Sequence, residues 1–202
     1  VGTIKECSST KSGNNIITTI VAFDNGEAFR AISERNYKKG TPKNTILNDL
    51  IGDLKPFGIE KGYVPIIEGS LIRGNSINGK TLDIISKLSN DKFFISDMKA
   101  YILGDFETLP SSVRSFNADS GLIGSPRREE AYIYFDVFFE PRIKMGQEIV
   151  LKSRVNKYLN GSLKIVSISH SGTISGSVAS DAITTLGGFL DASSSIYKKV
   201  VI

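Results

Sequence analysis

The sequence has little of the residue types on which many enzymes and metal sites depend. Its 202 residues include one cysteine, one histidine and no tryptophan. A single cysteine, Cys7, excludes a disulfide within the chain and a zinc site built from several cysteines. We expect Cys7 to be an unreactive small residue near a strand end. Because His170 is the only histidine and ends an alternating segment, we expect a structural histidine, and neither a catalytic triad nor a histidine-rich metal site.

Long apolar runs are also missing. No stretch approaches the roughly 18–20 apolar residues that a helix needs to cross a membrane, so no membrane insertion is predicted. The start of the chain has no basic segment followed by an apolar one, as a secretory signal would have. The chain begins at Val1 without an initiator methionine, and residues 1–4 have the pattern of the middle of a strand. We therefore expect a processed product or a fragment that lacks its N-terminal part.

A strong excess of one charge is absent too. The formal net charge is +4, and the basic residues form isolated pairs, at Lys38-Lys39, Arg127-Arg128 and Lys198-Lys199. Proteins that bind nucleic acid usually cluster Lys and Arg, often with aromatic residues between them. The sequence therefore predicts no nucleic-acid partner. With 40% apolar and 23% charged residues, it is typical of a globular protein with one compact domain or two small ones.

The first half of the sequence contains a predicted strand and two predicted helices. Residues 16–23 are rich in β-branched side chains and end at the turn signal Asp24-Asn25-Gly26. A helix is predicted to begin at Thr41-Pro42, with Thr41 as its N-cap, and apolar residues continue at helical spacing to Leu54. A second helix is predicted over residues 80–89, with an apolar stripe of Leu82, Ile84, Ile85 and Leu88.

Shorter strands are predicted from there onward. Residues 92–103 read as a hairpin that turns near Asp97-Met98, whereas residues 117–126 are rich in turn formers. Strands are predicted at residues 132–139 and 147–152, followed by a hairpin at Asn160-Gly161. Short strands at this spacing are typical of a small antiparallel β-barrel.

The predicted fold class is α+β and β-rich, with a small α/β unit followed by a small antiparallel β-barrel. We expect the α/β domain at residues 37–105 and the barrel domain at residues 106–175. Residues 176–202 are rich in Gly, Ser, Thr and Ala, and include Gly187-Gly188 and Ser193-Ser194-Ser195. This composition predicts a flexible tail.

The sharpest motif is the octapeptide Gly74–Thr81, which matches the nucleotide-loop pattern G-x-x-x-x-G-K-[ST] between a predicted strand and a predicted helix. In such a loop the backbone amides hold phosphates, Lys80 would offset their charge, and Thr81 would help to hold magnesium. The candidate cofactor-binding residues of this reading are Gly74, Gly79, Lys80 and Thr81.

The surrounding sequence does not support a nucleotide-binding domain. Such a domain needs a mostly parallel sheet with crossover helices after the loop, but hairpins are predicted after residue 90. A Walker-B aspartate should end a buried strand, yet Asp97 lies in a predicted turn and Asp136 lies within an alternating strand. We therefore predict no cofactor and interpret the octapeptide as a glycine-rich turn into a helix, with Ser76 or Asn78 capping the helix amides. A P-loop nucleotide-binding protein is the alternative.

No other cluster predicts catalysis. Glu129 and Glu130 are neighbours on an extended chain and point to opposite faces, so they are poor partners for paired-carboxylate chemistry. Asp49 and Asp53 share a helix face opposite the apolar stripe, which predicts ordinary solvated charge. No segment has calcium-loop spacing. The sequence therefore predicts no catalytic residues, no metal ligands and no enzyme activity.

A second alternative is a β-barrel module that binds nucleic acid or glycan. Such a module would need exposed aromatic residues on one barrel face. Tyr132 and Tyr134 are the nearby pair that could supply them.

Several segments, taken in order, resemble the baseplate hub proteins of contractile phage tails. Residues 15–20 with Asp24-Asn25-Gly26 are similar to the end of the first barrel of these hubs. The segment Gly74-Asn75-Ser76, with Gly79 and Leu82, resembles their glycine-rich turn into the next helix. The remaining matches follow the order of the first connecting segment and of the second barrel of Mu-type tail proteins: Tyr37–Thr41, Ser120–Pro126, Glu140–Gly146, Asn160-Gly161 and Val166–Gly172. The similarity covers most of residues 1–175.

This resemblance implies both a fold and a role. Residues 1–36 would be the end of a preceding β-barrel, while the residues after 176 match no part of the family. The family implies a homotrimeric ring at the centre of the baseplate, which joins the tail tube to the central spike through protein–protein interfaces. Its partners would be the spike and tube proteins. It would be located in the virion, after assembly in the host cytoplasm.

Overall fold

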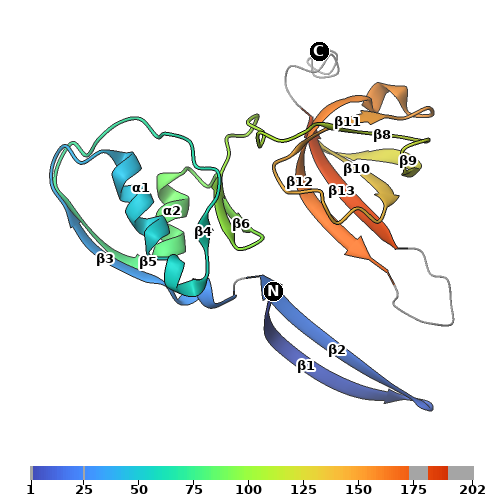
Figure 1. The fold of residues 1–202 in the computed structure, drawn as a ribbon, viewed down its shortest axis with the longest axis horizontal. Helices are drawn as coiled ribbons and strands as arrows, with labels where there is room; N and C mark the ends of the chain where they lie inside the picture. The colour runs from blue at the N-terminus through green and yellow to red at the C-terminus, as the bar shows by residue number, and fades with distance from the viewer. Residues whose placement is uncertain (1, 25, 173–181, 191–202) are drawn as a thin grey trace. The chain divides into compact units, whose positions relative to one another are not determined.

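The computed structural model describes residues 2–24, 26–172 and 182–190. The chain divides into two compact units, residues 1–103 and the residues from 104 onward. Each unit is described by itself, and Figure 1 labels most of the helices and strands of both.

The first unit begins with a two-stranded antiparallel hairpin. β1 (Gly2–Ser12) pairs with β2 (Asn15–Asp24) along almost its whole length, with one irregularity between Ile4 and Glu6. Gly13 in the turn has a φ of +61°, in the left-handed region that tight hairpin turns favour. The predicted strand at residues 16–23 is confirmed. A 3-10 helix, η1 (Gly26–Arg30), follows it.

Two helices and short strands make up the rest of the first unit. The helices are α1 (Lys43–Gly52) and α2 (Thr81–Leu88). The strands β3 (Ile32–Tyr37) and β5 (Asn75–Lys80) form an antiparallel pair, and a smaller sheet has the order β4-β7-β6. Its members are β4 (Glu60–Lys61), β6 (Phe93–Ser96) and β7 (Lys99–Ile102), and a second 3-10 helix is η2 (Lys55–Phe57).

Both predicted helices are confirmed, and their apolar stripes meet in one core. Ile46, Leu47, Leu50 and Ile51 of α1 are buried together with Ile85 of α2. The predicted capping of α1 is wrong by one residue, because Pro42 is the N-cap and no side chain caps the helix. The Thr41 hydroxyl donates instead to the Lys38 carbonyl oxygen, at 2.8 Å.

The predicted hairpin in residues 92–103 is confirmed, with its turn at Asp97-Met98. Both residues have a positive φ, of 50° and 60°. A two-residue turn with this backbone matches the right-handed twist of the strands that it connects. Ala100 and Ile102 of β7 then reach the same core as the helices.

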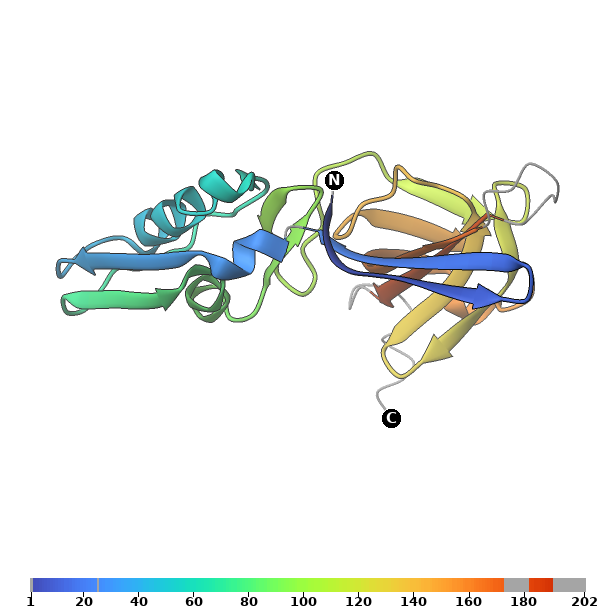
Figure 2. The same cartoon turned by 90° about the horizontal axis from the view of Figure 1, so that it is seen from below.

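The second unit is one six-stranded sheet that curls around a core of its own, as Figure 2 shows. Its strand order is β8-β11-β12-β13-β10-β9, and all neighbours are antiparallel except β8 and β11. The β-rich α+β fold class is confirmed. The strands are β8 (Arg114–Asn117), β9 (Leu122–Glu129), β10 (Tyr132–Phe138), β11 (Glu148–Lys152), β12 (Gly161–Ser171) and β13 (Ile183–Leu190).

β13 overturns part of the predicted flexible tail, because it lies between β12 and β10 in the middle of this sheet. Its two glycines are required by close packing. A Cβ at Gly187 would lie 2.8 Å from Cε1 of Tyr134, and a Cβ at Gly188 would lie 2.8 Å from Cβ of Leu163. Glycines that predicted a flexible tail are therefore needed here because neighbouring side chains leave no room for a Cβ. The serines at 193–195 lie outside the described residues.

Two further predictions for this unit are wrong. Residues 122–126, expected in turns, belong to β9, where Gly124 has a φ of +65° next to a register shift between the two strands. Asn160-Gly161 is not a two-residue hairpin turn. Residues 153–160 separate β11 from β12 and contain the 3-10 helix η3 (Lys157–Leu159). The Asn160 side chain closes this wider connection, since it accepts from the Ser153 amide and donates to the Ser153 carbonyl oxygen.

Candidate functional site

The octapeptide Gly74–Thr81 forms most of a strand, and the predicted glycine-rich turn is wrong. Residues 75–80 are β5, paired with β3 from Tyr37 opposite Asn75 to Ile32 opposite Lys80. In an antiparallel pair the backbone amides point sideways along the sheet, so they do not converge on a point as in a phosphate loop.

The predicted capping side chains have other partners. The Ser76 hydroxyl donates to Oδ1 of Asn36, and the Asn78 amide donates to Oε1 of Glu34. Both bonds cross from β5 to β3, whereas α2 has no side-chain cap. The prediction that one of them caps the helix is wrong, because the extended chain directs both side chains to the neighbouring strand.

Thr81, the residue that would help to hold magnesium, is fully buried. Its hydroxyl shares a hydrogen bond of 2.8 Å with the Ser33 hydroxyl, and its amide donates to the Ala31 carbonyl oxygen. These contacts tie the start of α2 to β3. The prediction that the chain needs no nucleotide cofactor stays a prediction, but Thr81 already has structural partners.

Asp49 and Asp53 are more than the solvated charges that the sequence predicted. Asp53 accepts hydrogen bonds from Arg35 and from the Ser33 hydroxyl, and the Arg35 contact in particular lowers its pKa. The Tyr37 hydroxyl donates to Oδ2 of Asp49, at 3.2 Å. Burial, together with the charge of Asp49, raises the pKa of Tyr37 to about 12. These contacts fasten α1 to β3.

The remaining candidates from the sequence lie apart from one another. Cys7 is exposed in the middle of β1, opposite Ile20, and not near a strand end. Nδ1 of His170 shares a hydrogen bond of 2.8 Å with the Thr184 hydroxyl, and its ring meets Phe139 edge-on. Within residues 2–24, 26–172 and 182–190, no three His, Cys, Asp or Glu side chains gather as a metal ion would require. No helix in that part of the chain is long and apolar enough to span a membrane.

Glu140 forms a further charged cluster that the sequence did not predict. Its carboxylate pairs with Arg114 of β8 and with Arg142, and its amide donates to the Thr184 hydroxyl. Burial by itself would raise the pKa of Glu140, but hydrogen bonds from the Arg142 amide and from both arginine side chains lower it overall. The cluster fastens the edge strand β8 to the segment that follows β10.

The β1–β2 hairpin carries a continuous series of exposed aliphatic side chains. Ile4, Ile16 and Ile20 are 61%, 75% and 59% exposed, and Ile17 and Val21 are exposed as well. Because strand side chains alternate, Ile16 and Ile20 lie on one face of β2, whereas Ile17 and Val21 lie on the other. In the described part of the chain, neither outer edge of the hairpin pairs with a further strand.

Apolar residues on both faces and unpaired edges are features of a strand pair that is covered by another chain. An isolated two-stranded hairpin is at best marginally stable in water. The sequence signal for this surface was the pair of doublets Ile16-Ile17 and Ile20-Val21 in a strand whose partner β1 is mostly polar. Doublets place apolar side chains on both faces, which a strand with one buried face does not need.

Comparisons with known proteins bear on the whole chain. A family model described as "Baseplate hub gp41" matches residues 1–173. The comparison with curated proteins gives no significant match. Three solved structures are similar at low sequence identity, which shows the fold alone.

The first is the 43 kDa tail protein of prophage MuSo2 from Shewanella oneidensis, with a TM-score of 0.63 and 11% identity over 94% of this chain and 75% of that one. The second is a tail protein from Neisseria meningitidis MC58, with a TM-score of 0.61 and 9% identity over 94% and 79% of the two chains. The third is an E. coli protein described as a component of the type VI secretion system that is structurally similar to the T4 tail proteins gp27 and gp5. Its TM-score is 0.58 at 9% identity, over 93% of this chain and 59% of that one.

Proposed function

This chain belongs to the baseplate hub gp41 family and is a structural component of a phage tail baseplate; we propose that it joins the tail tube to the central spike there. Its partners would be the tube and spike proteins and further copies of itself in a homotrimeric ring. The protein would assemble in the host cytoplasm and remain in the tail of the virion. In this proposal residues 1–36 contribute to a further β-barrel of the assembled hub.

The observation that carries the proposal is the exposed apolar surface of the β1–β2 hairpin. Each square ångström of apolar surface that a partner covers contributes about 25 cal/mol, so five aliphatic side chains supply a substantial driving force for association. Unpaired strand edges add backbone hydrogen bonds. A ring is built when such a surface on one subunit meets a different surface on the next, and a rotation closes the series.

The test is the mass of the chain in solution, measured by light scattering at several concentrations. We expect a trimer, and we expect the double substitution Ile17→Asp and Ile20→Asp to give a monomer. The double substitution Ser8→Asp and Thr10→Asp is the matched control, because it adds the same two negative charges to exposed polar positions of the same hairpin and should leave the trimer intact. A wild-type chain that stays monomeric, or a trimer that survives the isoleucine double substitution, would contradict the proposal.

We further propose that the chain acts through its interfaces, with no catalysis, nucleotide, nucleic acid or membrane insertion. The hydrogen bonds of Thr81 to Ser33 and of Asn78 to Glu34 support this, because they engage the octapeptide within the fold. Mg-ATP should not raise the melting temperature, and Lys80→Ala should not change the mass in solution. Binding of Mg-ATP that Lys80→Ala abolishes would instead favour a P-loop protein.

A further inference from the structure

A row of side chains crosses the outer face of the six-stranded sheet. Strand pairing places Glu148 of β11 opposite Lys164 of β12. The row continues with Phe189 of β13 opposite Lys164, and with Tyr132 of β10 opposite Phe189. Ile133, the neighbour of Tyr132, is fully buried in the core, so strand alternation turns the row away from the core.

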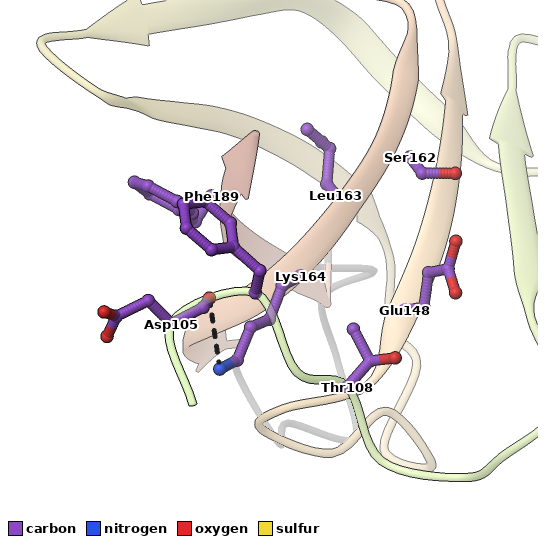
Figure 3. A pocket seen from close by; sticks show the side chains of 8 residues that line it. Asp105, Thr108, Glu148, Ser162, Leu163, Lys164 and Phe189 are labelled. Carbon is purple, nitrogen blue, oxygen red and sulfur yellow. Dashed lines mark hydrogen bonds between the residues drawn. The ribbon is translucent and has the colours of Figure 1, made fainter. Parts of the chain in front are cut away.

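Aromatic rings line a hollow along this row. The Phe189 ring lies next to Phe106 and Tyr132, with centroids 5.8 Å and 5.9 Å apart. A cavity of about 220 Å³ is bordered by Phe189, Tyr132 and Lys164. A narrower cavity of about 60 Å³ shares Phe189 and Lys164 and extends to Glu148. We call the two together the aromatic hollow, and Figure 3 shows the narrower part.

The rings of this hollow remain accessible to solvent. Phe106 is 55% exposed and Tyr132 is 39% exposed. The face of an aromatic ring carries partial negative charge and attracts cations that lie over it. The aromatic hollow therefore offers both apolar contact and a preference for positive charge.

Three charged groups border the hollow, Asp105, Lys164 and Glu148, and the last two differ in their partners. The Lys164 ammonium donates to the backbone carbonyl oxygens of Gly104 and Asp105, and Figure 3 marks its contact with Asp105. Its charge is thus held against the backbone. The Glu148 carboxylate forms no hydrogen bond or ion pair with any residue that the structure describes, and it lines the smaller cavity together with Thr108 and Ser162. A carboxylate acceptor therefore remains available in the cavity that Phe106 and Phe189 also line.

We infer that the aromatic hollow binds an arginine side chain presented by another protein of the tail. A guanidinium group is flat, stacks on aromatic rings, and donates paired hydrogen bonds to a carboxylate. An apolar side chain would cover Glu148 without pairing it, which costs free energy. An anion would be repelled by the same carboxylate.

This inference rests on the proposed function only in taking the partner to be a tail protein. The aromatic hollow belongs to the second unit, whereas the hairpin that carries the proposed function belongs to the first. Loss of trimerisation in the hairpin variants would therefore not affect it. The two proposals can fail separately.

The test is an NMR titration of the full chain with the peptide N-acetyl-Gly-Arg-Gly-amide. We expect amide shifts at Lys164, Phe189 and Tyr132, and none with the same peptide carrying neutral citrulline in place of arginine. Glu148→Gln should weaken binding about fivefold, the size of one partly exposed charge-assisted contact. Phe189→Leu, which keeps an apolar side chain but removes the ring, should weaken it by a similar factor. Glu130→Gln, in the β9–β10 turn, is the matched control and should change nothing.

Three outcomes would overturn the inference. These are equal binding of the citrulline peptide, an absence of shifts at the row, and unchanged affinity in Glu148→Gln. Tri-N-acetylchitotriose is titrated in parallel, since aromatic rings beside carboxylates and hydroxyls also suit sugars. If the sugar shifts these resonances and the arginine peptide does not, the hollow is a glycan site and the arginine inference is wrong.

Discussion

The β1–β2 hairpin and the six-stranded sheet both consist of β-strands with apolar side chains, but the sheet buries these side chains and the hairpin exposes them. In the sheet, Ile133, Phe135 and Val137 alternate along β10 and are all buried. In the hairpin, aliphatic residues lie on both faces of β2 and stay exposed. The sheet therefore provides its own core. The hairpin depends on whatever covers it.

The strand edges differ in the same way. The sheet ends on one side at β9, which carries a register shift, Pro126 and Arg127-Arg128, and on the other at the short strand β8. Prolines, charges, irregular register and short length all discourage pairing with a further chain. The hairpin has longer edges without proline, although β1 also carries charged residues and one register irregularity. Length and the absence of proline therefore distinguish the hairpin edges, and both agree with the proposed role of the hairpin in assembly.

The largest expected effect on stability comes from replacing one isoleucine by alanine in each region and comparing the two variants. Ile149→Ala in β11 removes a fully buried side chain and should cost about 2–5 kcal/mol in the free energy of unfolding. Ile16→Ala in the hairpin removes a side chain that is 75% exposed and should cost less than about 0.5 kcal/mol. Urea denaturation of the unassembled chain measures both. Equal costs would show that the hairpin is packed against the chain itself.

A smaller effect tests whether β13 is a packed strand. Gly188→Val should cost about 1–3 kcal/mol, because the new side chain overlaps Leu163. Gly52→Ala is the control, since nothing lies within 4 Å of the added Cβ. Alanine at that last position of α1 should be neutral, or more stable by up to about 1 kcal/mol. Thermal melting compares the two. If Gly188→Val melts like the wild type, the tail was correctly predicted to be flexible.

The smallest effect concerns the edge strand β8, which Glu140 anchors through Arg114. The pKa of Glu140 is lowered in the folded chain, so the Glu140 carboxylate stabilises the fold at any pH above its pKa in the unfolded chain. This stabilisation is lost as the pH falls through the pKa of Glu140 in the folded chain. Glu140→Gln should cost about 1 kcal/mol at neutral pH and reduce the acid dependence of stability. The rate of amide hydrogen exchange at β8 measures the loss of this anchoring, with Glu130→Gln as the control. Exchange at β8 that is the same in both variants would contradict the anchoring role.

Periodicity predicted the helices and the 92–103 hairpin because their information is local. Apolar residues at helical spacing from Ile46 to Leu54 suit one helix face, and in the structure that face is buried in the core of the first unit. The α1 cap was wrong by one residue, since Pro42 fixes a backbone conformation that suits the N-cap position itself. The exposed apolar surface of the β1–β2 hairpin was not predicted, because the doublets Ile16-Ile17 and Ile20-Val21 indicate a strand without indicating which of its faces is covered.

The octapeptide and the glycine pair of β13 show where local reasoning ends. Gly74–Thr81 matches the sequence motif of a nucleotide loop, but β3 lies beside it, pairs with its backbone and accepts hydrogen bonds from its polar side chains. Gly187 and Gly188 have the letters of a linker, but Tyr134 and Leu163 lie where their side chains would be. In both cases the deciding partner is far away in the sequence.

The sequence by itself thus determined the fold class, the two helices and, through the ordered resemblance of its segments, the hub family. These depend on repeat spacing and residue order, which the chain carries wherever it folds. Only the tertiary structure decided which glycines are crowded, which strand edges are closed, and which apolar residues stay uncovered. Such features depend on the neighbours that folding brings together. The identity of a glycine or an isoleucine in the sequence does not indicate whether another part of the chain packs against it.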